Sequence, residues 1–555
     1  MNLPLISNDS AYQTLVKRRH PTYAETLPHW TFCQSTYEGG REWFKQNVHR
    51  YLKEGDREFR DRLTRAYRFN HTREVVNLLT KYVFKEGITR NLEDAPDCVQ
   101  KFWSSATLTG GRIDTLMRAA ASQSSVTGCC WLVTDTTAEN DVVISRADAG
   151  SDRTYVYIVK PQDMLDFSYG EDGKLNWTLF RVMHRDDTDP MDSSGQVMNR
   201  YVLWTRNSYA VLQEVPSPNT PGFVSALPEP KLQLVSHGIN EIGEVPVVQL
   251  MHTDTDKIFS PPGLVDDTSY LDRACANYLS NLDAIIQDQT FSQLVMPSSA
   301  MNSGVDADDG NKALIEMGTK RIFTYNSDAG TPPTYISPDA SQAQLIISVV
   351  QKIINEIYHS VGMAGERTKQ DNSMGIDNSS GVAKAYDFDR LNALLAAKAE
   401  RLENAENALV RLVCLWNGET PPDELDDDAA LVAYPENYDV RGLPDEFDIA
   451  QNLMLVQAPD SVRRQQMTGM LPKLFARLPE ALRSEMLKEL ESWPIDPVQQ
   501  AQEMMAIAGT GNGPPKATIT SNSGGSSPGA APTPSSNVKG TKAPSKSTQG
   551  QNNKK

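Results

Sequence analysis

The chain has 555 residues, with 54 lysines and arginines against 71 aspartates and glutamates, and its formal net charge is −17. Single hydrophobic cores rarely grow beyond about 250–300 residues, so this length predicts several folding units. Hydrophobic residues make up 39% of the sequence, which is enough for a packed core and excludes the collagen-like and fully disordered classes. No apolar run approaches the roughly 20 residues that a bilayer requires, and residues 1–6 do not read as a secretory signal, so no membrane association is expected.

The cysteines and histidines are too scattered to predict a metal site. No C-x-x-C pair occurs among the six cysteines, and the eight histidines do not cluster. This usage favours a reducing, intracellular setting in which cysteines act as small apolar residues. We therefore expect neither a metal nor any other cofactor.

Residues 1–125 have a helical pattern, whereas residues 129–252 change to short strands. The helical part includes residues 70–84, with apolar positions at helical spacing before Gly87. The second part contains short β-branched or aromatic segments between Gly, Asp and Asn turns, which predicts a mainly antiparallel β region. The expected strands are 131–134, 142–145, 155–159, 177–182, 201–204, 210–212 and 245–248.

Two long helices with an insert between them are expected next. Apolar residues recur at helical spacing over 267–289 and again over 339–361, and each helix would be roughly 35 Å long. The insert 291–337 is rich in Gly and Pro and includes one short predicted strand at 321–325.

A polar, Gly- and Asn-rich loop at 364–380 precedes a very long predicted helix at 382–416. The apolar seam of this helix follows a heptad-like spacing, and Lys398 occupies its one polar position. The seam fits a coiled-coil arm and equally a helix buried against its own domain. Residues 445–507 have a helical pattern again, and the low-complexity tail from 509 holds six lysines and no acid, which leaves −17 − 6 = −23 on the rest of the chain.

Motifs for catalysis are missing from the sequence. No phosphate-binding loop, G-x-S-x-G elbow or H-E-x-x-H occurs. The acidic run at 306–310 fails as a calcium loop, because the turn glycine position holds Asn311 and the terminal glutamate position holds Met317. We expect that the protein is not an enzyme.

The order of these parts resembles the tailed-bacteriophage portal proteins, the head-to-tail connectors. Asn378-Ser379-Ser380-Gly381-Val382-Ala383 looks like the Ser-Gly-x-Ala motif that opens the long helix in many portals. The segment from Tyr37-Glu38-Gly39-Gly40 to Asn70-His71-Thr72-Arg73 resembles one portal subfamily. The likeness extends over about residues 30–505.

The resemblance implies an α+β fold with the portal architecture, divided in chain order. The implied parts are a wing with a helical start and a β-rich region (1–260), stem helix 1 (261–290), a small α/β clip (291–337), stem helix 2 (338–363), a tunnel loop (364–380), the long wing helix with a linker (381–440), a helical crown (441–508) and a disordered basic tail (509–555).

The implied function is structural. Copies of the chain would form a ring, generally a dodecamer, at one capsid vertex of the virion after assembly in the host cytoplasm. Double-stranded DNA would pass through it without sequence specificity during packaging and ejection. Terminase would dock first, adaptor or neck proteins would follow, and the major capsid and scaffold proteins would surround the ring.

Three groups of site residues follow from these parts. The tunnel loop offers Arg367 and Lys369 for phosphate contacts, with Asn372 and Ser373 beside them. Acidic stem residues facing a channel would repel phosphates and let DNA slide. Their alternative is to face solvent or neighbouring subunits. The candidates are Asp272, Asp283 and Asp288 for the stem and Lys320 and Arg321 for a clip contact with an acidic partner.

Two other classes of function remain open. One is a different virion or scaffold structural protein that associates through the helix 382–416. The other is a nucleic-acid-processing enzyme that uses acidic residues and Mg²⁺.

Overall fold

The computed structural model describes most of the chain before the tail. The described ranges are 9–136, 153–215, 231–289, 293–297, 323–325, 334–336, 341–363, 381–421, 431–435, 438, 443–475, 480–491 and 493, except for the single positions 53, 86, 188, 194 and 457. The chain divides into two compact units, of which the first holds residues 1–451 and 470–476 and the second holds 452–469 and 477–555. Helices and strands occupy separate stretches of the first unit, so the fold is α+β, as predicted.

Seven helices form the predicted helical start of the described chain. They are α1 (Asp9–Val16), α2 (Tyr23–Glu38), α3 (Arg41–Asn47), α4 (Asp56–Arg65), α5 (His71–Val83), α6 (Asp97–Ser104) and α7 (Ile113–Thr127). α5 shows why the local sequence folds this way. The Asn70 side chain caps its N-terminus by accepting from the Arg73 amide, and Val75, Leu79 and Val83 form its buried face.

The β region forms two antiparallel sheets. Strand β2 (Cys129–Thr136) lies between β3 (Thr154–Val159) and β9 (Val247–Met251). The larger sheet is a meander of β4 (Met164–Tyr169), β5 (Leu175–Arg185), β6 (Val197–Thr205), β7 (Ser208–Val215) and β8 (Lys231–Ile239). The sequence did not predict β4 or β8, and the predicted strand at 142–145 lies outside the described residues.

The meander is packed on both faces, because alternate side chains of a strand point to opposite sides. In β6, Tyr201 and Leu203 join a cluster with Trp30 of α2, whereas Val202 and Trp204 join a second cluster with Trp131 of β2. Helices α1 and α2 therefore cover one face of the sheet, and the β2 sheet packs against the other.

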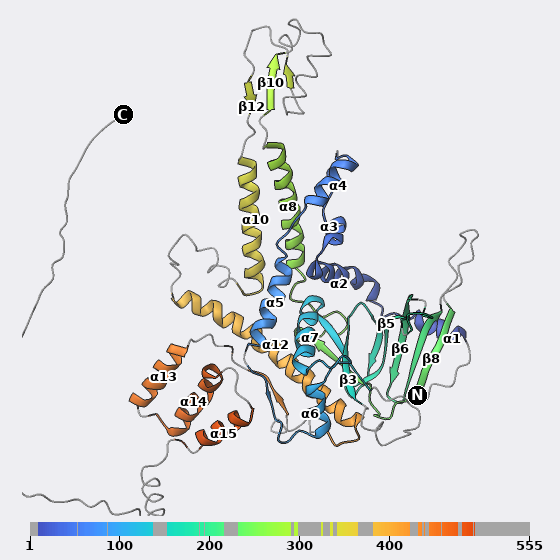
Figure 1. The fold of residues 1–555 in the computed structure, drawn as a ribbon, viewed down its shortest axis with the longest axis vertical. Helices are drawn as coiled ribbons and strands as arrows, with labels where there is room; N and C mark the ends of the chain where they lie inside the picture. Colours follow the sequence, from blue (N-terminus) through green and yellow to red (C-terminus); the bar gives the residue numbers. More distant parts are fainter. Residues whose placement is uncertain are drawn as a thin grey trace, which may run out of the picture. The chain divides into compact units, whose positions relative to one another are not determined.

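Two long helices, α8 (Thr268–Gln289) and α10 (Ser341–Ser360), lie side by side in Figure 1. Their buried residues Leu279 and Ile357 belong to the main core. The chain between them includes the small sheet β11-β10-β12, formed by β10 (Gln293–Pro297), β11 (Phe323–Tyr325) and β12 (Thr334–Ile336). The two helices confirm the periodic pattern of the sequence. Only the residues of β11 had been predicted as a strand of this sheet.

The longest helix, α12 (Gly381–Trp416), runs through the main core. The seam residues Leu391, Leu395, Leu402 and Leu409 are buried among α5, α6, α7 and β9. β13 (Val432–Ala433) then pairs with β1 (Thr89–Arg90) and holds the chain after α12 against the helical start.

The C-terminal helices are α13 (Leu443–Leu455), α14 (Asp460–Leu474) and α15 (Glu480–Glu491). The sequence suggested a break between residues 470 and 471, but α14 continues through it despite Gly469 and Pro472. Within the second unit, Arg464 donates to the carbonyl of Trp493.

Candidate functional site

The N-terminal helices and their connections pair with three carboxylates in or just before α8. His29 Nε2 lies 3.1 Å from Asp266 Oδ1, just before α8 begins. Arg68 lies 3.1 Å from Asp272, and Arg65 lies 3.1 Å from Asp283. Three carboxylates of the acidic segment 266–290 are thus matched by cationic or imidazole groups of the same chain.

Asp272 does not line a channel in this structure, which corrects its predicted role. Its side chain is only 1% exposed and pairs with Arg68, which is 4% exposed. The same carboxylate oxygen accepts from the Thr72 amide at 3.2 Å and the Thr72 hydroxyl at 2.9 Å. The physical reason is that a buried carboxylate is costly unless it has a charge partner and hydrogen bonds. Arg68, just before α5, supplies the charge, and Thr72 of α5 supplies the hydrogen bonds.

A second buried ion pair, between Arg62 and Glu54, lies against α8. The guanidinium donates to both Glu54 oxygens at 2.8 and 2.7 Å, to Ser280 Oγ of α8 at 2.9 Å and to the His49 carbonyl at 2.7 Å. The hydrogen bonds from Arg62 hold the pKa of Glu54 below its usual value. This bidentate geometry fixes the segment between α3 and α4 on α8.

The remaining predicted site residues have different outcomes. Asp283 is partly exposed and paired with Arg65. Asp288 lies in α8, but its side chain is outside the described set. The tunnel-loop candidates Arg367, Lys369, Asn372 and Ser373 and the clip candidates Lys320 and Arg321 also lie outside the described residues, so their roles stay predictions.

The halves of α8 and α10 next to the small sheet expose apolar side chains. Leu345 is 66% exposed, Ile347 44% and Ile286 50%, whereas Ile354 and Ile357 further along α10 are buried. Contiguous exposed apolar patches mark interaction sites, so these side chains are the candidates for a contact with another molecule.

Lys398 of α12 is buried in the first unit without a carboxylate partner among the described residues. Its side chain is 1% exposed, and its Nζ donates to Ser124 Oγ of α7 at 2.6 Å and lies 3.3 Å from His252 Nδ1. Burial lowers the pKa of Lys398 to about 7. The pKa of His252 is also held well below its usual value, first by its own burial and then by the charge of Lys398. The polar seam position was visible in the sequence, but its partners on α7 and after β9 were not.

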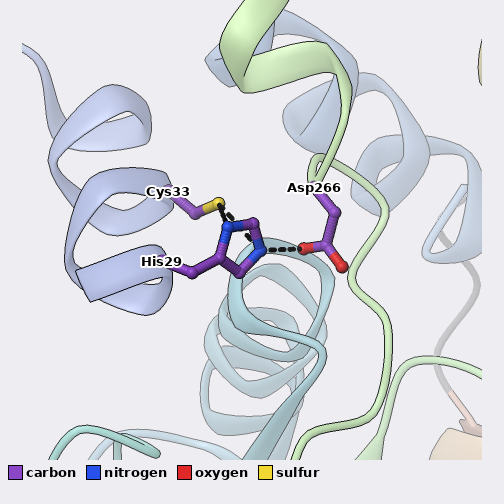
Figure 2. A group of neighbouring side chains, drawn as sticks. All are labelled: His29, Cys33 and Asp266. Carbon is purple, nitrogen blue, oxygen red and sulfur yellow. Dashed lines mark hydrogen bonds and ion pairs between the residues drawn. The ribbon is translucent and has the colours of Figure 1, made fainter. Parts of the chain in front are cut away.

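Figure 2 shows a cluster that the sequence analysis missed: His29 and Cys33 of α2 beside Asp266. Their ligand-type atoms all lie within 4.8 Å of one another, and Cys33 Sγ is 3.7 Å from His29 Nε2. The i, i+4 spacing on α2 was the available signal, since it puts both side chains on one helix face. The sequence could not predict that Asp266 joins this pair, because Asp266 lies more than 230 residues further along the chain.

None of the helices in the described ranges combines the length and apolar character needed to cross a membrane. No protein-family model matches the sequence, and no curated protein matches it either.

Solved structures with a similar chain come from gene transfer agent (GTA) particles. A chain from the virion of a native GTA particle is 11% identical with a TM-score of 0.37, and one from the neck of an empty particle, computed with C6 symmetry, is 10% identical with a TM-score of 0.35. A third, from the neck of a native particle computed with C12 symmetry, is 9% identical with a TM-score of 0.33. Each match covers 70% of this chain and 85% of the other. These TM-scores lie below 0.5, so none of these similarities assigns a function to this chain.

Proposed function

We propose that the protein is a portal-type structural protein of a phage-like virion. Identical copies form a ring at one capsid vertex, generally a dodecamer, and double-stranded DNA passes through it during packaging and ejection. Terminase docks on the segment 291–337 during packaging, where Lys320 and Arg321 meet an acidic surface, and adaptor or neck proteins follow. The major capsid and scaffold proteins surround the ring, and the protein has no catalytic role.

The observation that carries this proposal is the α8–α10 pair. The two helices flank a small sheet in the chain, as the portal resemblance requires of a stem and its clip. On α10, Leu345 and Ile347 are 66% and 44% exposed within the described part of the chain. In a closed ring every copy meets two neighbours, so cyclic association buries such a surface on all copies at once.

The charge of the two helices agrees with a passage that does not retain DNA. α8 and α10 contain Asp272, Asp283, Asp288 and Glu356 against Arg273 and Lys352, which gives 2 − 4 = −2. Two of these carboxylates are already paired with arginines of the N-terminal helices. With those two arginines included, the net charge is −2 + 2 = 0, and a surface without excess positive charge releases few counterions from DNA and therefore binds it weakly. Arg367 and Lys369 remain the proposed phosphate contacts.

The alternative of a coiled-coil scaffold through the helix 382–416 loses its support. It needs the apolar seam of α12 to be free for another chain. Leu391, Leu395, Leu402 and Leu409 are instead buried in the core of this chain.

Size-exclusion chromatography with light scattering tests the ring. Twelve copies of a 61.5 kDa chain give 12 × 61.5 = 738 kDa, and negative-stain images should show a ring with an axial hole. Leu345→Glu should reduce assembly by placing a charge in the interface. The matched control is Leu108→Glu, because Leu108 is similarly exposed (60%) but lies between α6 and α7.

A monomer under all conditions, including co-expression with the scaffold, contradicts the proposal. So does an equal loss of assembly in both leucine variants, because the contact would then not involve α10. Metal-dependent nuclease or ATPase activity of the purified protein would instead favour an enzyme.

A further inference from the structure

We propose that His29, Cys33 and Asp266 form a zinc site, with solvent as the fourth ligand. The site is independent of the proposed ring function. Imidazole nitrogen, thiolate sulfur and carboxylate oxygen are the three donor types that Zn²⁺ takes in proteins. Here one donor of each type faces the same point between α2 and the start of α8 (Figure 2).

Two of the three distances between the donors fit a tetrahedral ion, and the third, from Cys33 Sγ to Asp266, is within 4.8 Å. With Zn–N near 2.0 Å, Zn–O near 2.1 Å and Zn–S near 2.3 Å, the edges of the tetrahedron are about 3.4 Å for N···O and about 3.5 Å for N···S. His29 Nε2 lies 3.1 Å from Asp266 Oδ1 and 3.7 Å from Cys33 Sγ. Side-chain adjustments of a few tenths of an ångström therefore bring these two distances to those of a metal site.

The neighbours of the cluster orient two of its donors. His29 Nδ1 lies 3.3 Å from the Tyr270 hydroxyl, which leaves Nε2 as the nitrogen that faces Asp266. Asp266 Oδ2 accepts from the Gly263 amide at 2.9 Å, which leaves Oδ1 for the ion. Around protein zinc ions, the histidine nitrogen or carboxylate oxygen that does not bind the metal is usually held by a hydrogen bond of this kind.

Burial and charge also suit the ion. Cys33 is fully buried, whereas the side chains of His29 and Asp266 are 30% and 31% exposed, so zinc and a water ligand can enter from their side. One thiolate and one carboxylate balance the 2+ charge of zinc.

The test uses the reduced full-length protein. After equilibration with Zn²⁺ and dialysis against metal-free buffer, elemental mass spectrometry should find one zinc per chain. Replacement by Co²⁺ should produce a sulfur-to-cobalt charge-transfer band. Cys33→Ser should abolish this band, and His29→Gln should lose the stoichiometric zinc. The matched control Cys98→Ser, which removes a cysteine outside the cluster, should keep both signals.

A positioning variant separates metal binding from simple packing. Tyr270→Phe keeps the ring contact with Phe32 but removes the hydroxyl that faces His29, and it should weaken zinc binding by about 10- to 100-fold. Absence of stoichiometric zinc from the wild-type protein, or a cobalt–sulfur band that survives in Cys33→Ser, would overturn the proposal. The wild-type measurements decide the matter even where a variant fails to fold.

Discussion

Replacing Lys398 with methionine should stabilise the first unit, and the gain should depend on pH. The lysine amine is fully buried between α12, α7 and the end of β9, and its described contacts include Ser124 and His252 but no carboxylate. Met has a similar length and shape without the charge. Ser124 Oγ keeps its hydrogen bond to the Ala120 carbonyl at 2.8 Å, so the substitution leaves that hydroxyl satisfied.

The size of the effect follows from the pKa difference. Lys398 has a pKa of about 7 in the folded protein, against the ordinary 10.5 in the unfolded chain. At pH 6 both states carry the proton, and the buried charge costs on the order of 5 kcal/mol at about 1.4 kcal/mol per pKa unit. Between pH 7 and 10.5 the unfolded chain binds the additional proton, so the penalty shrinks as pH rises. About 2 kcal/mol remains at pH 9.

Urea unfolding followed by tryptophan fluorescence measures this gain. The free energy of unfolding of Lys398→Met should exceed that of the wild type by several kcal/mol at pH 6 and by clearly less at pH 9. Comparing the two proteins at each pH cancels the titration of the groups that Lys398 does not affect; His252, whose pKa Lys398 helps to lower, is the exception. Both must be compared at a concentration where their assembly state is equal, since association adds to apparent stability.

The control is Lys81→Met, which removes an exposed lysine of α5 and should change stability little at either pH. A destabilised Lys398→Met protein would refute the reasoning, because it would show that the amine makes a net favourable interaction. A gain that is equal at pH 6 and pH 9 would also refute it, since the effect would then come from packing and not from charge.

Three further changes test the contacts between the N-terminal helices and α8. Arg62→Met should destabilise the protein by about 3–5 kcal/mol in urea unfolding, because it leaves Glu54 buried without its partner, and adding Glu54→Gln should recover part of the loss. Asp272→Asn should cost a similar amount, because it leaves Arg68 as an unpaired buried cation; a neutral result would show that water solvates this pair. Arg65→Ala removes an exposed pair with Asp283 and should change unfolding by less than about 1 kcal/mol, and its small effect should fade further in high salt.

Helical periodicity predicted the long elements well. The apolar spacing of α8, α10 and α12 located all three within a few residues of their observed ends. A long helix that is buried along one face has apolar residues at regular helical spacing in its own sequence, whichever elements it packs against.

The missed strands have a different physical origin. β8 alternates between exposed and half-buried residues and includes Ser236, His237 and Gly238, so its apolar signal is weak. β10 and β12 are held by pairing with each other, with the register Val295 to Thr334, and their short sequences do not carry that information.

The sites depend on contacts between distant residues. The sequence identified Asp272 and Lys398 as charged positions on long helices, but it could not show that Arg68 covers the first and that α7 encloses the second. The acidic composition of the segment 266–290 predicted a channel surface that repels DNA phosphates. In the fold, much of that charge holds the N-terminal helices instead.

The length of α12 also has a mechanical consequence. Its 36 residues extend for about 54 Å. Its beginning follows directly on residues 364–380, and near its far end Arg411 donates to Glu244 at 2.6 Å while Trp416 packs edge-on against Trp204. Over this length, a tilt of about 5° at one end corresponds to a displacement of roughly 5 Å at the other. A displacement at the start of α12 would therefore reach the β-sheets through the contacts of Arg411 and Trp416.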